Sequence, residues 1–249
     1  MAETNGTDGT MRLQVFMAHA GVASRRKCEE FIQDGLVKVN GRIVTELGFK
    51  VGEDDSVIFR RRRVYPIKNF VYLALNKPPK FLSTTSDPER RPLALDLLRP
   101  GFDMRLYPVG RLDFLSSGLI FFTNDGDFAL AVSHPRSEVE KEYLVETKKD
   151  IPEDLLQDYQ KGITVEGERY RLKSYTIKSP HLVLLVLGEG KNREIRSVFA
   201  SRGLYPKRIH RVRIGSVTLK GLEPGRFRRL SPGEVSAFFK KGKGHGSSN

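Results

Sequence analysis

The segment covering residues 110–126 constrains the fold of this chain more than any other part of the sequence. Residues 119–122 form an apolar run typical of a strand buried in a protein core, and a polar turn that holds the carboxylate of Asp113 precedes them. A glycine on either side of this turn lets the backbone bend and approach a ligand closely. A rigid strand that presents an acid in an accessible turn is an arrangement suited to catalysis.

Length and composition indicate an intracellular protein. The 249 residues allow one large domain or two unequal ones. The single cysteine, Cys28, cannot form an internal disulfide, which favours a reducing compartment. No segment approaches the roughly 18 apolar residues of a membrane span, and residues 1–10 lack the apolar core of a signal peptide. We therefore expect a cytoplasmic protein without a membrane partner.

The positive charge of the chain is concentrated in two segments. The net charge is +13. Residues 60–68 hold five cations and no acid, and residues 189–229 hold twelve cations and three acids, whereas the rest of the chain is close to balance. Such concentration is typical of a surface that binds a polyanion, since neutralising phosphates and releasing counterions dominates nucleic-acid affinity. The alternative is a solvated basic face, and the charge alone favours nucleic acid.

Residues 11–60 are predicted to form a small domain of two helices and a hairpin. Apolar residues at helical spacing indicate the first helix, Ser24 is the expected N-cap of the second, and the second ends near Gly35. Alternating valines on either side of the Asn40-Gly41 turn indicate the hairpin, and residues 57–59 supply a closing strand. The tails, residues 1–10 and 240–249, are expected not to pack, and the four arginines that begin at residue 60 mark a basic linker over residues 61–69.

Residues 70–239 are predicted to form a larger α+β domain on a mixed or antiparallel sheet. The candidate strands are 70–76, 118–123, 142–147, 182–187 and 212–219, and the candidate helices are 92–98, 153–160, 192–202 and 232–239. Their order does not alternate as βαβ units should. Ser231 and Glu234 form a capping box for the last helix, with Pro232 at its first position.

Three cations occupy the first turn of the helix that Ser24 caps: Arg25, Arg26 and Lys27. Each opposes the helix dipole and should cost on the order of 0.3–1 kcal/mol, whereas a bound phosphate is favoured by both the dipole and the side chains. Solvent exposure without function is the alternative, and we favour phosphate contact. The span from Arg12 to Gly41 is also similar to the alpha-L RNA-binding domain shared with a ribosomal small-subunit protein, in which this helix pair and hairpin bind structured RNA.

The larger domain resembles the pseudouridine synthases of the RsuA/RluB type, which isomerise uridine in ribosomal RNA. Four motifs carry the resemblance in order along the chain: Leu75-Asn76-Lys77-Pro78, the Gly110 to Leu119 run, Lys141-Glu142-Tyr143-Leu144, and Glu189-Gly190-Lys191-Asn192-Arg193-Glu194-Ile195-Arg196. The sequence departs from the family at Ser197, where a second basic residue is common. The implied fold is a mixed or antiparallel-sheet pseudouridine synthase catalytic domain preceded by a small α/β RNA-binding domain.

The resemblance implies a role for individual residues. Asp113 would be the nucleophile, Arg196 would lie against it and orient it, and Tyr143 would stack on the flipped base and take part in proton transfer. Leu112 and Ile195 would pack around the base. The remaining expected RNA contacts are Arg111, which would fill the gap left by the base, together with Ser24, Arg25, Arg26, Lys27, Lys191, Asn192 and Arg193.

The implied reaction uses no cofactor and no metal, and the expected partner of a monomeric enzyme is ribosomal RNA or a ribosomal subunit precursor. Large-subunit 23S rRNA is the favoured substrate because the run over residues 20–27 is close to that of the large-subunit enzymes; 16S rRNA is the alternative. A non-catalytic ribosome-assembly factor and a metal-dependent nuclease are the other classes considered. Asp113 has no acidic neighbour in its motif, which counts against the nuclease, and Asp125 with Asp127 is expected to form a turn and helix N-cap rather than a metal loop.

Overall fold

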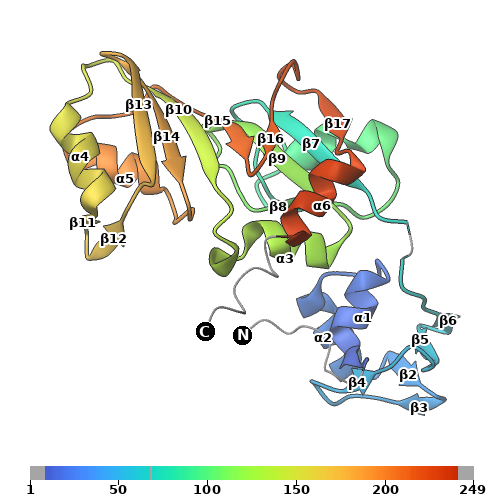
Figure 1. Ribbon diagram of the computed structural model, residues 1–249. Helices are drawn as coiled ribbons and strands as arrows, with labels where there is room; N and C mark the ends of the chain where they lie inside the picture. The colour runs from blue at the N-terminus through green and yellow to red at the C-terminus, as the bar shows by residue number, and fades with distance from the viewer. Residues whose placement is uncertain (1–8, 68, 241–249) are drawn as a thin grey trace. The chain divides into compact units, whose positions relative to one another are not determined.

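The computed structural model describes residues 9–67 and 69–240 and divides the chain into two compact units, residues 1–70 and 71–249 (Figure 1). Each unit has its own hydrophobic core. The predicted tails over residues 1–8 and 241–249 lie outside the described residues, whereas Lys240, which was assigned to the second tail, is the last residue of a helix. Among the described helices, none is long and apolar enough to cross a bilayer.

The N-terminal unit packs two helices, α1 (Leu13–His19) and α2 (Arg25–Gln33), against short strands. The predicted N-cap is confirmed, because the Ser24 hydroxyl accepts a hydrogen bond of 3.2 Å from the backbone N–H of Lys27. One sheet has the order β3-β2-β5-β6, and β1 pairs with β4. These strands are β1 (Met11–Arg12), β2 (Val37–Val39), β3 (Arg42–Ile43), β4 (Lys50–Val51), β5 (Val57–Phe59) and β6 (Arg62–Arg63).

The prediction of a linker beginning at residue 61 was wrong for the arginine run. Arg62 and Arg63 form β6, which pairs with β5, and the two residues between these strands have positive φ angles of 46° at Arg60 and 70° at Arg61. Two such residues in succession form the tight turn that matches the twist of a hairpin. The Arg60 guanidinium lies 5.2 Å from the ring centre of Phe31. The basic segment therefore belongs to the sheet of the N-terminal unit.

The second unit is built on a mixed sheet with the path β13-β14-β10-β15-β9-β7-β17, and two short strands are added to it as β16 on β15 and β8 on β9. Most pairs are antiparallel, and β15 with β9 is parallel. The α+β architecture is therefore the one expected. The strands are β7 (Tyr72–Lys77), β8 (Tyr107–Val109), β9 (Ser117–Thr123), β10 (Lys141–Glu146), β13 (Ser174–Ser179), β14 (Leu182–Leu187), β15 (Arg208–Ile214), β16 (Val217–Thr218) and β17 (Phe227–Arg229).

Helices cover both faces of this sheet, because its strands bury side chains on both sides. Along β9, Ile120 and Phe122 belong to one core, and Leu119 and Phe121 belong to the other. The first core is covered by α4 (Glu153–Lys161) and α5 (Glu194–Ala200), and the second by α3 (Gly126–Ser133) and α6 (Pro232–Lys240). Figure 1 shows α4 and α5 near β13 and β14, and α3 beside α6.

Several local predictions hold and others do not. The capping box is confirmed, since Ser231 and Glu234 exchange hydrogen bonds at the start of α6. The strand predicted over 212–219 was wrong, because Gly215, at φ +57°, turns the chain between β15 and β16. The helix predicted over 92–98 is a short 3-10 turn. That turn is η1 (Ala94–Leu97). Elements that the sequence did not predict include η2 (Arg99–Gly101), η3 (Pro135–Ser137), β11 (Ile163–Val165) and β12 (Glu168–Tyr170).

Candidate active site

The turn that carries Asp113 is fixed at several points. The Ser83 hydroxyl donates to the carbonyl of Leu112 at 3.0 Å and accepts from its N–H at 3.2 Å. The N–H of Ser116 donates to the carbonyl of Asp113 at 3.0 Å. These contacts hold the backbone on both sides of the acid. The Asp113 side chain keeps 33% of its surface exposed, so it can meet a ligand from a rigid support.

Gly118 sets the distance between this turn and a strand far along the sequence. It pairs with Arg211 in the parallel ladder of β9 and β15, at φ +106°. A Cβ atom at this position would lie 2.2 Å from the carbonyl oxygen of Arg211, well inside van der Waals contact. Only glycine therefore allows the two strands to approach as they do, which explains one glycine of the segment over residues 110–126.

The cation that pairs with Asp113 comes from α5. Arg196 places its Nε atom 3.5 Å from Oδ2 of Asp113, and its Nη2 donates to the hydroxyl of Ser116 at 3.4 Å. The Arg196 side chain is 17% exposed, so the pair is only partly screened by water. A planar guanidinium in this position holds the carboxylate in one orientation.

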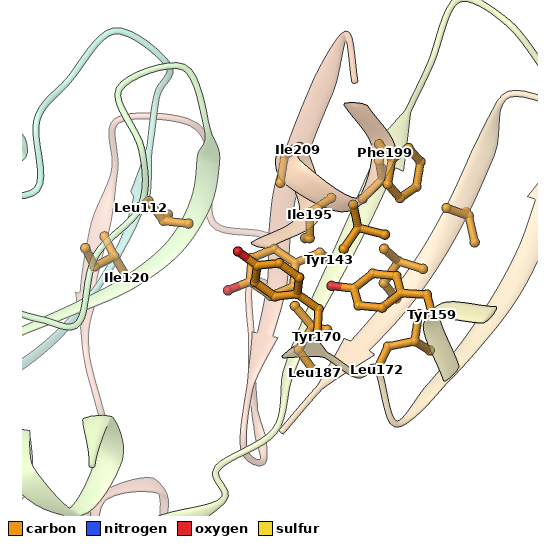
Figure 2. Close-up of a cluster of buried hydrophobic side chains, with 14 of the residues drawn as sticks. Leu112, Ile120, Tyr143, Tyr159, Tyr170, Leu172, Leu187, Ile195, Phe199 and Ile209 are labelled. Carbon is orange, nitrogen blue, oxygen red and sulfur yellow. The ribbon is translucent and has the colours of Figure 1, made fainter. Parts of the chain in front are cut away.

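Tyr143 lies on β10 with 7% of its surface exposed. Its hydroxyl accepts a 3.3 Å hydrogen bond from Nη1 of Arg211, which also donates from Nε to the carbonyl of Leu119 at 2.6 Å. Figure 2 shows Tyr143 in a cluster of buried side chains that includes Ile195. Arg211 itself is 3% exposed, and its Nη2 atom has no hydrogen-bond partner among the described residues. The phenol is thus held by a buried cation.

One buried and one partly buried lysine add to the positive charge around the site. Burial, then the charge of Arg211, lowers the pKa of Lys77 to about 8, and the charge of Asp113 opposes this shift. The Lys77 ammonium is fully buried and donates to two backbone carbonyls, those of Pro78 and Phe81, at 3.0 and 2.9 Å. Burial and Arg211 likewise lower the pKa of Lys141 to about 8. Cations packed this closely stabilise added negative charge, such as an ionised carboxylate or a phosphate.

A buried carboxyl fixes the start of α5. Glu194 is 3% exposed, and burial raises its pKa to about 7. It accepts hydrogen bonds from the hydroxyl of Tyr159 at 2.9 Å and from the N–H of Lys191 at 3.1 Å. Burial and the nearby Glu194 charge also raise the pKa of Tyr159 well above its usual value. This arrangement supports the helix that presents Arg196.

The residues predicted for catalysis and base packing line one cavity of about 160 Å³ in the catalytic unit. Its lining includes all five of them, Leu112, Asp113, Tyr143, Ile195 and Arg196, and three of the predicted RNA contacts, Arg111, Lys191 and Arg193. Asn192 is exposed and is not among the lining residues. The Lys191 ammonium lies 2.6 Å from the Glu168 carboxylate, so it has a partner within the protein. The roles of these residues stay predictions.

The remaining predicted RNA contacts belong to the N-terminal unit. Ser24 uses its hydroxyl as a helix cap, and Arg25 and Arg26 are exposed in the first turn of α2. Lys27 forms an ion pair with Glu30 and lies 5.3 Å from the ring centre of Phe31. All three cations are therefore exposed to solvent, and their predicted contact with phosphate stays a prediction.

Sequence reasoning missed Lys77 and Arg211 as parts of the site. The strand pattern offered a signal for Arg211. It lies two positions after Ile209, so both side chains point to the same, buried side of β15, where a charged group must have partners. The expected helix cap at Asp125 is confirmed, since its carboxylate accepts from the N–H groups of Asp127 and Phe128. Among the described residues, no three His, Cys, Asp or Glu side chains are grouped to hold a metal ion.

Comparison with known proteins defines the class that this fold and site represent. The model of the RNA pseudouridylate synthase family matches residues 71–201, and the S4 domain model matches residues 11–57. The chain therefore belongs to the RNA pseudouridine synthases, with an S4 RNA-binding domain before the catalytic domain.

Individual relatives match over nearly their whole length. The chain is 48% identical to an uncharacterized RNA pseudouridine synthase of Borreliella burgdorferi over 91% of this chain and 92% of the relative. It is 39% identical to the ribosomal large subunit pseudouridine synthase B of Bacillus subtilis, over 90% and 93%. A crystal structure of a pseudouridylate synthase has a TM-score of 0.66 at 27% identity and covers 91% of this chain and 99% of that one.

Proposed function

We propose that this enzyme isomerises a specific uridine of large-subunit ribosomal RNA with Asp113 as its nucleophile. One observation carries the assignment of the nucleophile: the Asp113 carboxylate lies in the family's catalytic domain, in a cavity where Arg196 is 3.5 Å away and Tyr143 lines the same wall. Three residues from separate motifs converge there. A carboxylate that is held rigidly beside a guanidinium is well placed for covalent attack.

The proposed reaction is an isomerisation, so the composition of the nucleoside does not change. The bond between N1 of uracil and C1′ of ribose breaks, a bond between C5 and C1′ forms, and the hydrogen of C5 leaves while N1 gains a proton. Asp113 attacks either C1′ or the base, which lets uracil detach and turn. The target base must leave its stack first, and Arg111, an exposed residue that lines the cavity, would fill the space that the base leaves. Neither route calls on a cofactor or a metal ion.

One observation supports the large subunit, and a second supports a structured RNA as the substrate. The Bacillus subtilis relative that is 39% identical is named for the large subunit. The two exposed arginines at the start of α2 lie in an RNA-binding domain and suit a structured RNA with closely spaced phosphates. The proposed enzyme is cytoplasmic and monomeric, and it acts on rRNA or on a precursor of the ribosomal subunit. A small-subunit rRNA target is the second candidate.

Replacing Asp113 tests the proposal directly. In Asp113→Asn the shape of the side chain stays and its nucleophilic charge is lost, so we expect turnover to fall to background while RNA affinity stays within about twofold. The measurement is release of tritium from C5 of uridine in transcribed large- and small-subunit rRNA. Asp103→Asn, at an exposed acid of the same domain, is the matched control and should act like the wild-type enzyme.

Each alternative has its own outcome in this experiment. An assembly factor would release no tritium in any form while binding RNA unchanged. A metal-dependent nuclease would shorten the RNA and lose activity with a chelator. Turnover of Asp113→Asn above background would show that another group is the nucleophile. Release from small-subunit rRNA alone would move the substrate to that subunit.

A further inference from the structure

A second hollow adjoins the cavity that holds Asp113. It has a volume of about 320 Å³ and is formed by the outer side of α5, the loop that follows this helix, and the turn after β11. This volume reaches the lower end of the range for small-ligand sites. The lining includes Arg193, Arg196, Ser197, Ser201 and Tyr205. The isomerisation of a single uridine uses only the inner cavity and leaves this hollow without a role.

Two arginines line both hollows. Arg193 and Arg196 contribute to the cavity of Asp113 and to the second hollow, so these side chains stand between the two spaces. Arg196 is engaged by Asp113 and Ser116. Arg193 is exposed, and within the part of the chain that the structure describes it has no ion pair. A cation between two adjacent spaces is where the phosphate joining two successive nucleotides would lie.

The outer wall of the hollow carries an aromatic ring. Tyr205 is 75% exposed, the largest exposed fraction among the large apolar side chains that the structure describes, and Pro206 follows it in the loop. The helix side opposite offers the small side chains of Ser197 and Ser201, which leave room for a planar group. Base stacking on an exposed tyrosine tolerates any sequence because every base has a π-face.

Glu166 on the rim indicates which part of a nucleotide enters. Its carboxylate repels phosphate but accepts hydrogen bonds from the N–H groups of a base. The cations lie on the side that faces Asp113, and the acid and the tyrosine lie among the other lining residues. The charge distribution therefore suits a base in the hollow and a phosphate at its inner edge.

We propose that this second hollow binds the nucleotide adjacent to the target uridine, with its base stacked on Tyr205 and the phosphate between the two nucleotides held by Arg193. The inference rests on the proposed function in that the inner cavity receives the uridine. It adds a recognition subsite: the enzyme takes a substrate in which two successive nucleotides, not one, have left the helical stack. Such a requirement favours a loop or bulge over a continuous duplex.

A tryptophan reporter tests the binding separately from the chemistry. The chain has no tryptophan, so Tyr205→Trp creates a single fluorophore that keeps the ability to stack. With transcribed large-subunit rRNA we expect its emission to be quenched. The control is Phe239→Trp on α6, 42% exposed and on the opposite face of the sheet, whose emission should not change. Equal quenching at both positions, or none at position 205, would overturn the proposal.

Activity variants give the energetic test. Tyr205→Ala should raise KM for the rRNA roughly 5- to 150-fold, the range for loss of one stacked base, with kcat within about twofold. Tyr205→Phe should match the wild type. Removing the base on one side of the uridine in a synthetic fragment should weaken wild-type binding by the same factor and leave Tyr205→Ala unaffected. Additive effects, or an unchanged KM in Tyr205→Ala, would refute the subsite.

The outcomes distinguish this inference from the function on which it rests. If wild-type enzyme released no tritium from any rRNA, the proposed function would fail, and the reporter would still measure whether RNA reaches Tyr205. If Asp113→Asn were active, the nucleophile would be wrong and the KM comparison would stand. Tyr205 is mostly exposed, so its variants should melt at the wild-type temperature, and a matched melt excludes unfolding as the cause of a raised KM.

Discussion

The two units of the molecule use positive charge in opposite ways. In the N-terminal unit the cations of α2 lie on the surface, where water screens them and a partner can reach them. In the catalytic unit Lys77 and Arg211 are almost fully buried, and burial lowers the pKa of the lysine to about 8. Exposed cations contribute affinity that depends on salt, whereas buried cations fix the geometry and potential of a site. The two sets should therefore respond differently to substitution, salt and pH.

The largest effect is expected at the half-buried pair of the active site. Arg196→Met leaves Asp113 without the guanidinium that orients it, and we expect kcat to fall roughly 100-fold, or about 2.7 kcal/mol of transition-state stabilisation. Arg196→Lys should keep part of the activity because the charge remains while the planar fork is lost. Single-turnover rates measure the effect. Arg202→Met, at an arginine that is 40% exposed and pairs with Asp154 and Asp158, is the matched control and should leave kcat unchanged.

A comparable effect, on stability rather than rate, is expected at Glu194. Its pKa rises from 4.5 to about 7 on folding, so the folded state favours the protonated form. The resulting stability is fully present below pH 4.5 and is lost as the pH rises through about 7, by about 3 kcal/mol in total. Glu194→Gln should lose this dependence. Urea unfolding of both proteins from pH 5 to 8 gives the difference between their unfolding free energies, in which the contributions of the titrating groups that the two proteins share cancel.

An exposed carboxylate provides the control for this measurement. Glu223→Gln removes an exposed acid elsewhere in the catalytic unit that is not among the groups that shift the pKa of Glu194, and the pH dependence of its unfolding free energy should match the wild type. Parallel curves for the wild type and Glu194→Gln would mean that the carboxyl is hydrated and ionised in the folded protein. The expected difference between buried and exposed charged groups would then be contradicted at Glu194.

A smaller effect is expected at the exposed cations of α2. Arg25→Ala combined with Arg26→Ala should weaken rRNA binding several-fold and reduce the slope of log K against log salt by up to about 2, one for each phosphate that is no longer neutralised. The chemical step at saturating RNA should not change. Titrations at several salt concentrations measure the slope. Lys148→Ala with Lys149→Ala, an exposed pair of adjacent cations in the catalytic unit, should give the wild-type slope.

The smallest effect concerns the free protein. The same double substitution in α2 removes two cations from a helix N-terminus, where each is unfavourable by about 0.3–1 kcal/mol. Thermal melts without RNA should therefore show a slight gain in stability, larger at low salt than at high salt. A loss of stability would mean that the arginines make favourable contacts within the N-terminal unit. They would then have a structural role like that of the buried cations, which contradicts the contrast drawn between the two units.

Sequence patterns predicted the elements whose causes are local. The cap at Ser24, the cap at Asp125 and the capping box at Ser231 each depend on residues within three positions, and the buried strand of residues 119–122 follows from its apolar run. The resemblance to a family, rather than any spacing, brought Asp113 and Arg196 together. The arginine hairpin was missed because its turn is formed by non-glycine residues at positive φ.

The rest depends on contacts between distant parts of the chain. Nothing near Arg211 in the sequence indicates that its guanidinium reaches the carbonyls of Leu119 and Arg111 and the hydroxyl of Tyr143. The depressed pKa of Lys77 has the same origin, since it requires burial and the charge of Arg211. Pairwise geometry of this kind appears only once the strands are assembled, and it also reveals the second hollow beside α5.

The parallel pairing of β9 with β15 has a consequence for the timing of activity during synthesis. Arg211 donates to the carbonyl of Leu119, 92 residues earlier in the chain, and the missing Cβ of Gly118 lets the backbone of the same strand approach closely. A ribosome releases the turn of Asp113 long before it has made β15, and pairing over such a separation forms late. The nascent chain therefore carries Asp113 before the strand that packs beside its turn has been made. Catalytic competence arrives only when nearly the whole chain has been translated.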